Sequence, residues 1–164
     1  MLQLQLRVFQ KPRVAVVEMN GMIGGALRPG PYVEILRTLR QASWARAVVI
    51  SIDSPGGSAW GSDYLRMAVA RLAEEKPVVA FIRGVGASGG YLIASAAQRI
   101  VALPSALVGS IGVISLRPIL QELLQRVGVH FIVTKGGHLK DMGAFYREPT
   151  EEERQKEQDL VDEY

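Results

Sequence analysis

Short, continuous apolar runs alternate with segments of helical periodicity along most of this chain. The runs 47–52 and 78–82 contain no charged residue, and each is followed by glycine-rich residues and then by a stretch with apolar positions three or four residues apart. Uncharged runs of this length are typical of strands buried on both faces of a parallel sheet. The alternation predicts an α/β fold with right-handed crossovers and a mostly parallel sheet.

The same periodicities predict the remaining elements. Further strands are expected at residues 2–8, 13–19, 99–103, 108–115 and 129–134. Helices are expected at residues 32–42, 62–75, 91–97, 118–127 and 148–164. We expect a single domain over residues 1–164 that is cut before its last elements, because the sequence stops within a charged helical pattern without a cap.

Composition excludes several classes of function. The net charge is +3, and the basic residues are scattered rather than gathered in a stripe with aromatics, so nucleic-acid binding is not expected. The chain has no cysteine, which excludes disulfides and thiolate metal sites, and no metal or cofactor is expected. The longest uncharged run, 100–116, is too short for a membrane span and contains Pro104. Either the protein is soluble or its membrane anchor lies outside this chain.

A glycine-rich segment, 84–90, follows the second buried run and contains Ser88. Small neighbours on both sides would let a substrate carbonyl approach this serine, and free N–H groups at a helix start would suit an oxyanion. The structural alternative is an ordinary strand-to-helix turn with Ser88 as the N-cap. A dinucleotide loop is disfavoured, because the expected acidic residue about twenty positions further on is absent.

The segment Asp53-Ser54-Pro55-Gly56-Gly57 follows the first buried run. A Pro-Gly-Gly turn exposes successive backbone N–H groups, which could form half of an oxyanion hole, although such turns are also common structural features. The carboxyl ends of parallel strands meet at one edge of a sheet. The sequence therefore predicts that this turn and Ser88 lie close together.

A reactive serine needs a base. The two histidines, His130 and His138, have no pattern that supports a Ser–His–Asp triad. Lys135 and Lys140 follow the last expected strand, but a lysine acts as a base only when it is neutral, which requires burial or nearby positive charge. From the residues alone, exposed surface lysines remain an alternative for both.

Four stretches, taken together, resemble signal peptide peptidase A, a family of serine–lysine proteases with a Clp-protease/crotonase-like fold of repeated β-β-α units. They occur in the family's order at residues 16–24, 52–57, 86–113 and 135–152. The resemblance implies that Ser88 is the nucleophile and Lys140 the general base, with Lys135 ranked second. The reaction implied is peptide hydrolysis through an acyl-enzyme.

The resemblance also assigns the residues around the nucleophile. It implies an oxyanion hole formed by Gly57, or its neighbour Gly56, together with the N–H of Gly89. Ser110, in the segment Gly-Ser-Ile-Gly, is implied to orient the lysine. No metal is implied in this site.

Family membership would imply peptide substrates, among them cleaved signal peptides, and a homo-oligomer whose subunits share sites. Membrane association would come through segments absent here. Two departures are the missing anchor and the early end of the chain.

Three rival functions remain. The first is a crotonase-type acyl-CoA enzyme and the second a Clp-type protease, although no histidine lies between residue 88 and residue 130. The third is a non-catalytic scaffold of the same fold.

Overall fold

The computed structural model describes residues 13–163, which divide into two compact units between Ile111 and Gly112. The strand expected at residues 2–8 lies outside the described residues. That both units together make one protease domain over residues 1–164 stays a prediction.

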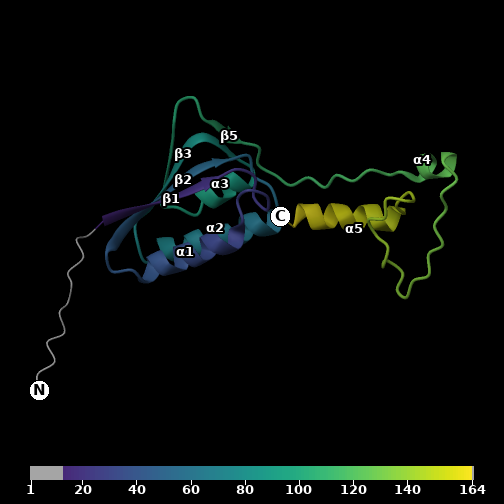
Figure 1. The fold of residues 1–164 in the computed structure, drawn as a ribbon, viewed down its shortest axis with the longest axis horizontal. Coiled ribbons are helices and arrows are strands. Elements are labelled where there is room, and N and C mark those ends of the chain that lie inside the picture. Colours follow the sequence, from purple (N-terminus) through teal and green to yellow (C-terminus); the bar gives the residue numbers. More distant parts are fainter. Residues whose placement is uncertain (1–12, 164) are drawn as a thin grey trace, which may run out of the picture. The chain divides into compact units, whose positions relative to one another are not determined.

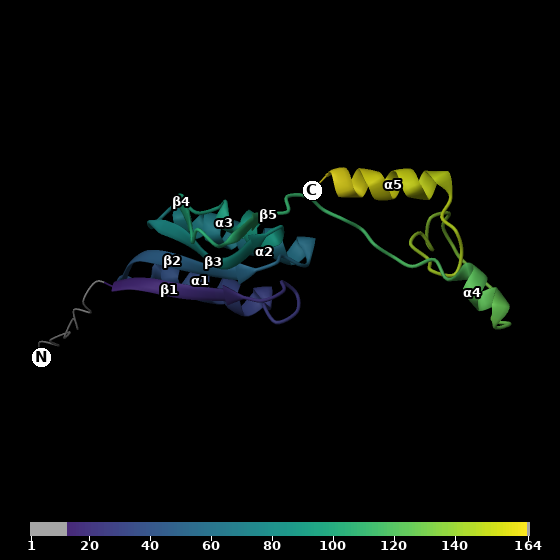
Figure 2. The same cartoon turned by 90° about the horizontal axis from the view of Figure 1, so that it is seen from above.

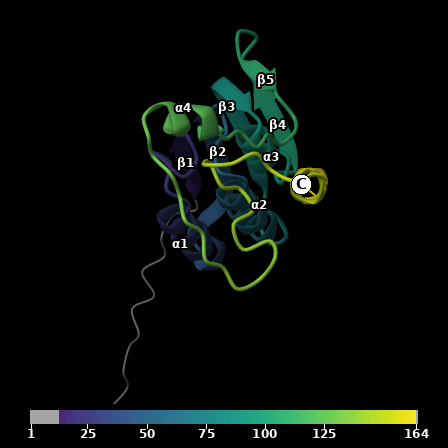
Figure 3. The same ribbon diagram turned by 90° about the vertical axis from the view of Figure 1, so that its right-hand side faces the viewer.

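A parallel sheet forms the first unit. Its strands are β1 (Arg13–Asn20), β2 (Ala45–Ser54), β3 (Val78–Ala87), β4 (Arg99–Ala102) and β5 (Leu107–Gly109). The order is β1-β2-β3-β4, and both β4 and β5 pair with β3, β4 along its first half and β5 along its second (Figure 3). Every described pair is parallel, which confirms the expected α/β fold with a mostly parallel sheet.

The helices of this unit are α1 (Pro29–Gln41), α2 (Ala59–Ala73) and α3 (Gly89–Ala94). Helices α1 and α2 pack side by side along the sheet (Figures 1 and 2). The opposite face of the sheet is partly exposed at β1. Val14 and Val16 on that face are 60% and 62% exposed, whereas the alternate residues Ala15 and Val17 are buried. Within residues 13–163, no helix combines the length and apolar character required to cross a membrane.

The core lies between the sheet and these helices. Its largest fully buried side chains include Met19, Ile50, Ile52, Leu65 and Ile82. Burial of each such side chain stabilises the fold by about 1.5–3 kcal/mol relative to an exposed one. The ends of β2 and β3 are therefore held by a closely packed interior, and the turns that follow them start from fixed positions.

Strand β3 is longer than the sequence predicted. The segment 84–90 was expected to be a loop, but β3 continues to Ala87 because β5 pairs with it from Val85 to Ala87. The Asp53 side chain also accepts a hydrogen bond from the Val85 N–H at 2.9 Å. The irregular part of this segment is thereby reduced to the position of Ser88.

The second unit contains α4 (Gln121–Arg126) and α5 (Glu151–Asp162). Thr150 caps α5, and Glu153 completes the reciprocal capping box. The prediction of a strand at 129–134 was wrong. This segment pairs with no strand in the described chain, and Ile132 is 97% exposed. The expected strand 108–115 is likewise reduced to β5, because no described neighbour continues the ladder beyond Gly109.

Candidate active site

Ser88 lies at the junction between β3 and α3. It has a φ of 50°, a left-handed backbone conformation that costs a non-glycine residue about 1–3 kcal/mol. Its N–H donates to the Gly109 carbonyl at 2.8 Å, and its side chain makes no capping hydrogen bond to α3. Ser88 thus occupies the N-cap position of α3, as the structural alternative expected, but its half-buried side chain does not cap the helix. A strained strand-to-helix turn is a recurrent way to present a nucleophilic serine.

The Pro-Gly-Gly turn packs directly on this serine. A Cβ atom at Gly56 would lie 2.8 Å from the Ser88 Cβ and 2.9 Å from the Gly89 nitrogen. Gly56 also has a φ of +95°, so only glycine fits both the conformation and the space. The structure thus brings the two loops together at adjacent strand ends, as the sequence predicted.

The backbone N–H groups of the two loops differ in their partners. The Gly56 N–H donates to the buried Ser54 Oγ at 3.2 Å, and that hydroxyl donates to the Gly21 carbonyl at 2.7 Å. Within residues 13–163, the N–H groups of Gly57 and Gly89 donate to no protein acceptor. The structure therefore favours Gly57 over Gly56 as the partner of Gly89 in an oxyanion hole.

Several residues that sequence reasoning did not select hold these N–H groups in place. Ile23 brackets the turn, since its N–H donates to the Gly56 carbonyl at 2.8 Å and its carbonyl accepts from Ser58 at 2.9 Å. Ser62 is buried against Gly89, where a Cβ atom would lie 2.0 Å from the Ser62 Oγ. Ile23 belonged to a stretch that carried the resemblance, whereas Ser62 had no sequence signal beyond its place in a helix.

The Gly-Ser-Ile-Gly segment also reaches this site. Gly109, at the end of β5, pairs with Ala87, the residue before Ser88. Ser110 follows and has a φ of 52°, the second described non-glycine residue with a positive φ. The start of this segment therefore lies beside Ser88, and the implied role of Ser110 in orienting the lysine stays a prediction.

Both candidate lysines belong to the second unit, whereas Ser88 belongs to the first. The Lys135 amino group donates to the His138 carbonyl at 2.9 Å and forms an ion pair with Asp141. Lys140 is exposed, and in the described chain its amino group makes no hydrogen bond or ion pair. In the described chain, the Lys135 amino group is therefore held by polar contacts, whereas the Lys140 amino group is not.

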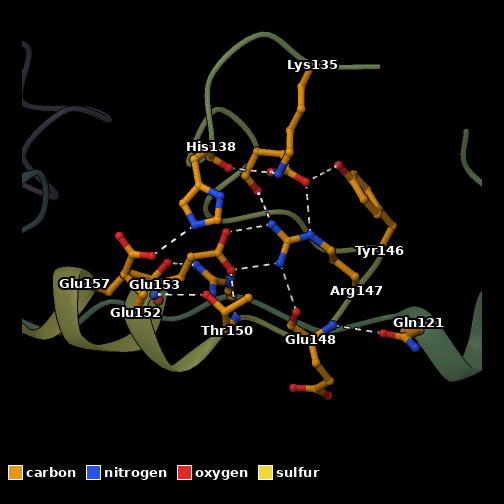
Figure 4. A network of polar contacts seen from close by, with 12 residues as sticks. Gln121, Lys135, His138, Tyr146, Arg147, Glu148, Thr150, Glu152, Glu153 and Glu157 are labelled. Carbon is orange, nitrogen blue, oxygen red and sulfur yellow. Dashed lines mark hydrogen bonds and ion pairs between the residues drawn. The ribbon is translucent and has the colours of Figure 1, made fainter. Parts of the chain in front are cut away.

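Asp141, the residue after Lys140, belongs to a charged network. Figure 4 shows this network, with Lys135, Arg147 and Glu153 labelled. Hydrogen bonds from Arg147 and then Lys135 hold the pKa of the Asp141 carboxyl far below its ordinary value. Hydrogen bonds from Arg147 and the Thr150 backbone lower the pKa of the buried Glu153 to about 2. Burial, together with a hydrogen bond to Asp141, raises the pKa of Tyr146. This network was not predicted, because residues spaced six apart belong to no regular periodicity.

The histidines do not suggest a metal site. His138 Nε2 lies 3.0 Å from a Glu152 oxygen, and both side chains are largely exposed. Among residues 13–163, no group of three or more histidine, aspartate or glutamate side chains is arranged to hold a metal ion.

The model of peptidase family S49 matches residues 70–164, a span that includes Ser88 and Lys140. The chain belongs to this family. The resemblance to signal peptide peptidase A is thereby confirmed. Over 145 residues the chain is 35% identical to the chloroplastic serine protease SPPA of Arabidopsis thaliana, and the match covers 82% of this chain. It spans only 21% of that relative's length.

Solved structures show the same fold. The 1510-N membrane-bound stomatin-specific protease, a serine-to-alanine mutant, matches with a TM-score of 0.52 at 24% identity, covering 63% of this chain and 50% of that one. A lysine-to-alanine mutant of that protease, in complex with a substrate peptide, matches with a TM-score of 0.50 at 26% identity over 63% and 47%. An enoyl-CoA hydratase/isomerase family member matches at 0.50 and 21% identity over 73% and 50%. The Clp-protease/crotonase-like fold is confirmed.

Replacing Gly56 tests the packing of the turn on the nucleophile. Gly56→Ala should displace Ser88 or the Gly89 N–H, because the new methyl group has no room. We expect the rate of Ser88 modification by a fluorophosphonate to fall about 100-fold, the size of effect seen when an oxyanion donor is lost. The control is Gly30→Ala, since a Cβ atom at Gly30 meets nothing within 4 Å. Equal labelling rates in both variants would contradict the proposed geometry.

The lowered pKa values predict acid sensitivity in the second unit. Glu153 and Asp141 have pKa values below their ordinary 4.5 and 3.8, so their stabilising contribution is complete above those values and is lost as the pH falls towards 2. Amide hydrogen exchange in α5 should therefore accelerate between about pH 4.5 and pH 2, after correction for the intrinsic rate. Glu153→Gln should exchange faster at neutral pH and depend less on pH, whereas Glu151→Gln, an exposed control, should match the parent. A pH-independent exchange rate in the parent would refute this account.

Proposed function

We propose that this chain carries the reactive centre of a serine endopeptidase that cleaves peptides through an acyl-enzyme. Ser88 is the nucleophile, Lys140 the general base, and the N–H groups of Gly57 and Gly89 form the oxyanion hole. The observation that carries the proposal is the strained Ser88 packed against a turn whose neighbouring N–H groups have no acceptor in the described chain. Peptidase-family membership supports it.

The reaction follows from these groups. In the neutral form that this role requires, Lys140 takes the proton from the Ser88 hydroxyl, and the oxygen attacks the peptide carbonyl carbon. The N–H groups of Gly57 and Gly89 stabilise the negative charge that develops on the carbonyl oxygen. The lysine ammonium then protonates the departing amine, leaving an ester on Ser88. Water, deprotonated by the same lysine, hydrolyses this ester and regenerates the free serine.

The contacts of the two lysines favour Lys140 over Lys135 as the base. The Lys135 amino group is engaged by the Asp141 carboxylate and the His138 carbonyl, so it would have to leave both contacts before it could accept a proton from Ser88. The Lys140 amino group has no carboxylate partner within residues 13–163. The solved relative with a bound substrate peptide is a lysine-to-alanine mutant, which supports a reactive lysine in that protein.

The active form we propose is a homo-oligomer in which neighbouring copies share sites. Supporting this, unpaired extended segments of the second unit expose large apolar side chains: Ile114 is 80%, Leu116 85% and Ile132 97% exposed. Such surfaces are typical of faces that another chain covers. The substrates would be peptides such as signal-peptide remnants.

Fluorophosphonate labelling followed by mapping of the modified residue tests this function. We expect one adduct, on Ser88, which disappears in Ser88→Ala. Loss of the general base should slow labelling in Lys140→Ala by about 10²- to 10⁴-fold. The matched control is Lys156→Ala, which removes an exposed lysine of α5. Loss of labelling in Lys135→Ala but not in Lys140→Ala would overturn the assignment of the base.

The oligomeric state is measured on the same samples by sedimentation. If a confirmed oligomer gives no adduct on Ser88, the protease function is refuted. Binding of an acyl-CoA would then favour a crotonase-type enzyme, and its absence a scaffold.

A further inference from the structure

Every N–H group of the Arg147 guanidinium is engaged. Its Nε donates to Asp141 Oδ2 at 3.0 Å, and its two terminal nitrogens donate to the two Glu153 carboxylate oxygens at 2.8 and 2.6 Å. The remaining donors reach the carbonyls of Glu148 at 3.0 Å and Asp141 at 3.4 Å. Figure 4 shows this guanidinium at the centre of the network. Planar, bidentate pairing of this kind specifies geometry as well as energy.

The two carboxylates that Arg147 joins belong to different parts of the unit. Asp141 directly follows Lys140 and lies in the irregular segment 135–148. Glu153 is only 2% exposed and is fixed at the first turn of α5, where it and Thr150 form the capping box. Arg147 therefore connects Asp141, the residue after Lys140, to Glu153, the buried carboxylate in the first turn of α5.

The backbone alone holds this segment weakly. Residues 135–148 contain no helix or strand, and their backbone is held only by isolated turns: the Met142 N–H donates to the Leu139 carbonyl at 3.0 Å and the Ala144 N–H to the Asp141 carbonyl at 3.1 Å, whereas the Lys140 N–H reaches the Gly137 carbonyl at 3.4 Å. Side-chain contacts converge instead on Asp141, which accepts from Arg147, from Lys135 and from the Tyr146 hydroxyl at 3.2 Å. Asp141 is 13% exposed at its side chain, so this convergence is shielded from water. The turns beside Lys140 are thus joined to the rest of the unit through the side-chain contacts of Asp141.

We propose that Arg147 is a positioning residue for Lys140, acting by clamping Asp141 to Glu153. This inference rests on the proposed function of Lys140 as the general base. Arg147 touches neither substrate nor nucleophile in this role; it restricts the path of the backbone that carries the base. Proton transfer depends steeply on geometry, so loosening this segment should slow the chemical step rather than weaken peptide binding.

The test replaces Arg147 with lysine, which keeps the charge but cannot form the fork. In the oligomer, Arg147→Lys should lower kcat for peptide hydrolysis by about 10- to 100-fold with little change in KM. The matched control is Arg154→Lys in α5, because Arg154 pairs with Glu148 at the exposed surface. Equal kcat values in the two variants would overturn the proposal.

A double-mutant cycle separates positioning from general destabilisation. If Arg147 acts through Lys140, adding Arg147→Lys to Lys140→Ala should not reduce the residual rate further. A second drop of the same size as in the parent would show that Arg147 acts elsewhere, and would contradict the proposal. All rates are compared at a temperature where circular dichroism shows each variant fully folded.

Amide hydrogen exchange keeps this test independent of the proposed function. In Arg147→Lys, exchange at residues 137–144 should be at least about ten times faster, while β1–β3 remain unchanged. If the parent neither hydrolyses peptides nor labels at Ser88, the protease function fails, but this exchange result still decides whether the clamp exists. Unchanged exchange at 137–144 would refute the clamp whatever the activity.

Discussion

The close approach of Gly56 to Ser88 is the constraint on which the candidate site depends. A side chain at position 56 would overlap both the serine and the Gly89 nitrogen, so the two loops can meet only through glycine. The contact forms because β2 and β3 are neighbours in a parallel sheet, whose strands deliver both loops to the same edge. Ser88 then keeps its positive φ because the packed core around the strand ends prevents the strained turn from relaxing.

The second unit is stabilised by different interactions from the first. None of the apolar residues described in this unit is buried, and charged side chains link its irregular segment 135–148 to α5. A buried carboxylate is tolerable only when hydrogen-bonded donors compensate for its desolvation, and the bidentate contact from Arg147 provides that for Glu153. The position of the proposed nucleophile, Ser88, is thus determined by steric packing, whereas the surroundings of the proposed base, Lys140, are determined largely by ion pairs.

Much of the first unit could be predicted from sequence, because uncharged runs and helical periodicity report burial directly. The positions of the strands before Asp53 and Ser88 were confirmed, as was the meeting of the two loops. Pairing that depends on distant partners could not be predicted. β3 runs on to Ala87 because β5 lies beside it, and residues 129–134 form no strand because the described chain supplies no neighbour.

Only part of the candidate site could be predicted from the sequence, for a related reason. The preference for Gly57 over Gly56 depends on a hydrogen bond that the sequence does not reveal, since the Ser54 hydroxyl already accepts from the Gly56 N–H. Likewise, the difference between Lys135 and Lys140 depends on the ion pair with Asp141, and nothing in the spacing of these residues indicates which lysine it engages.

The most direct test of this account is a crystal structure of the oligomer after reaction with a fluorophosphonate. The account predicts a phosphonyl group on the Ser88 oxygen, with its free oxygen within hydrogen-bonding distance of the Gly57 and Gly89 nitrogens. A phosphonyl oxygen directed away from both nitrogens, or an adduct on another residue, would contradict it.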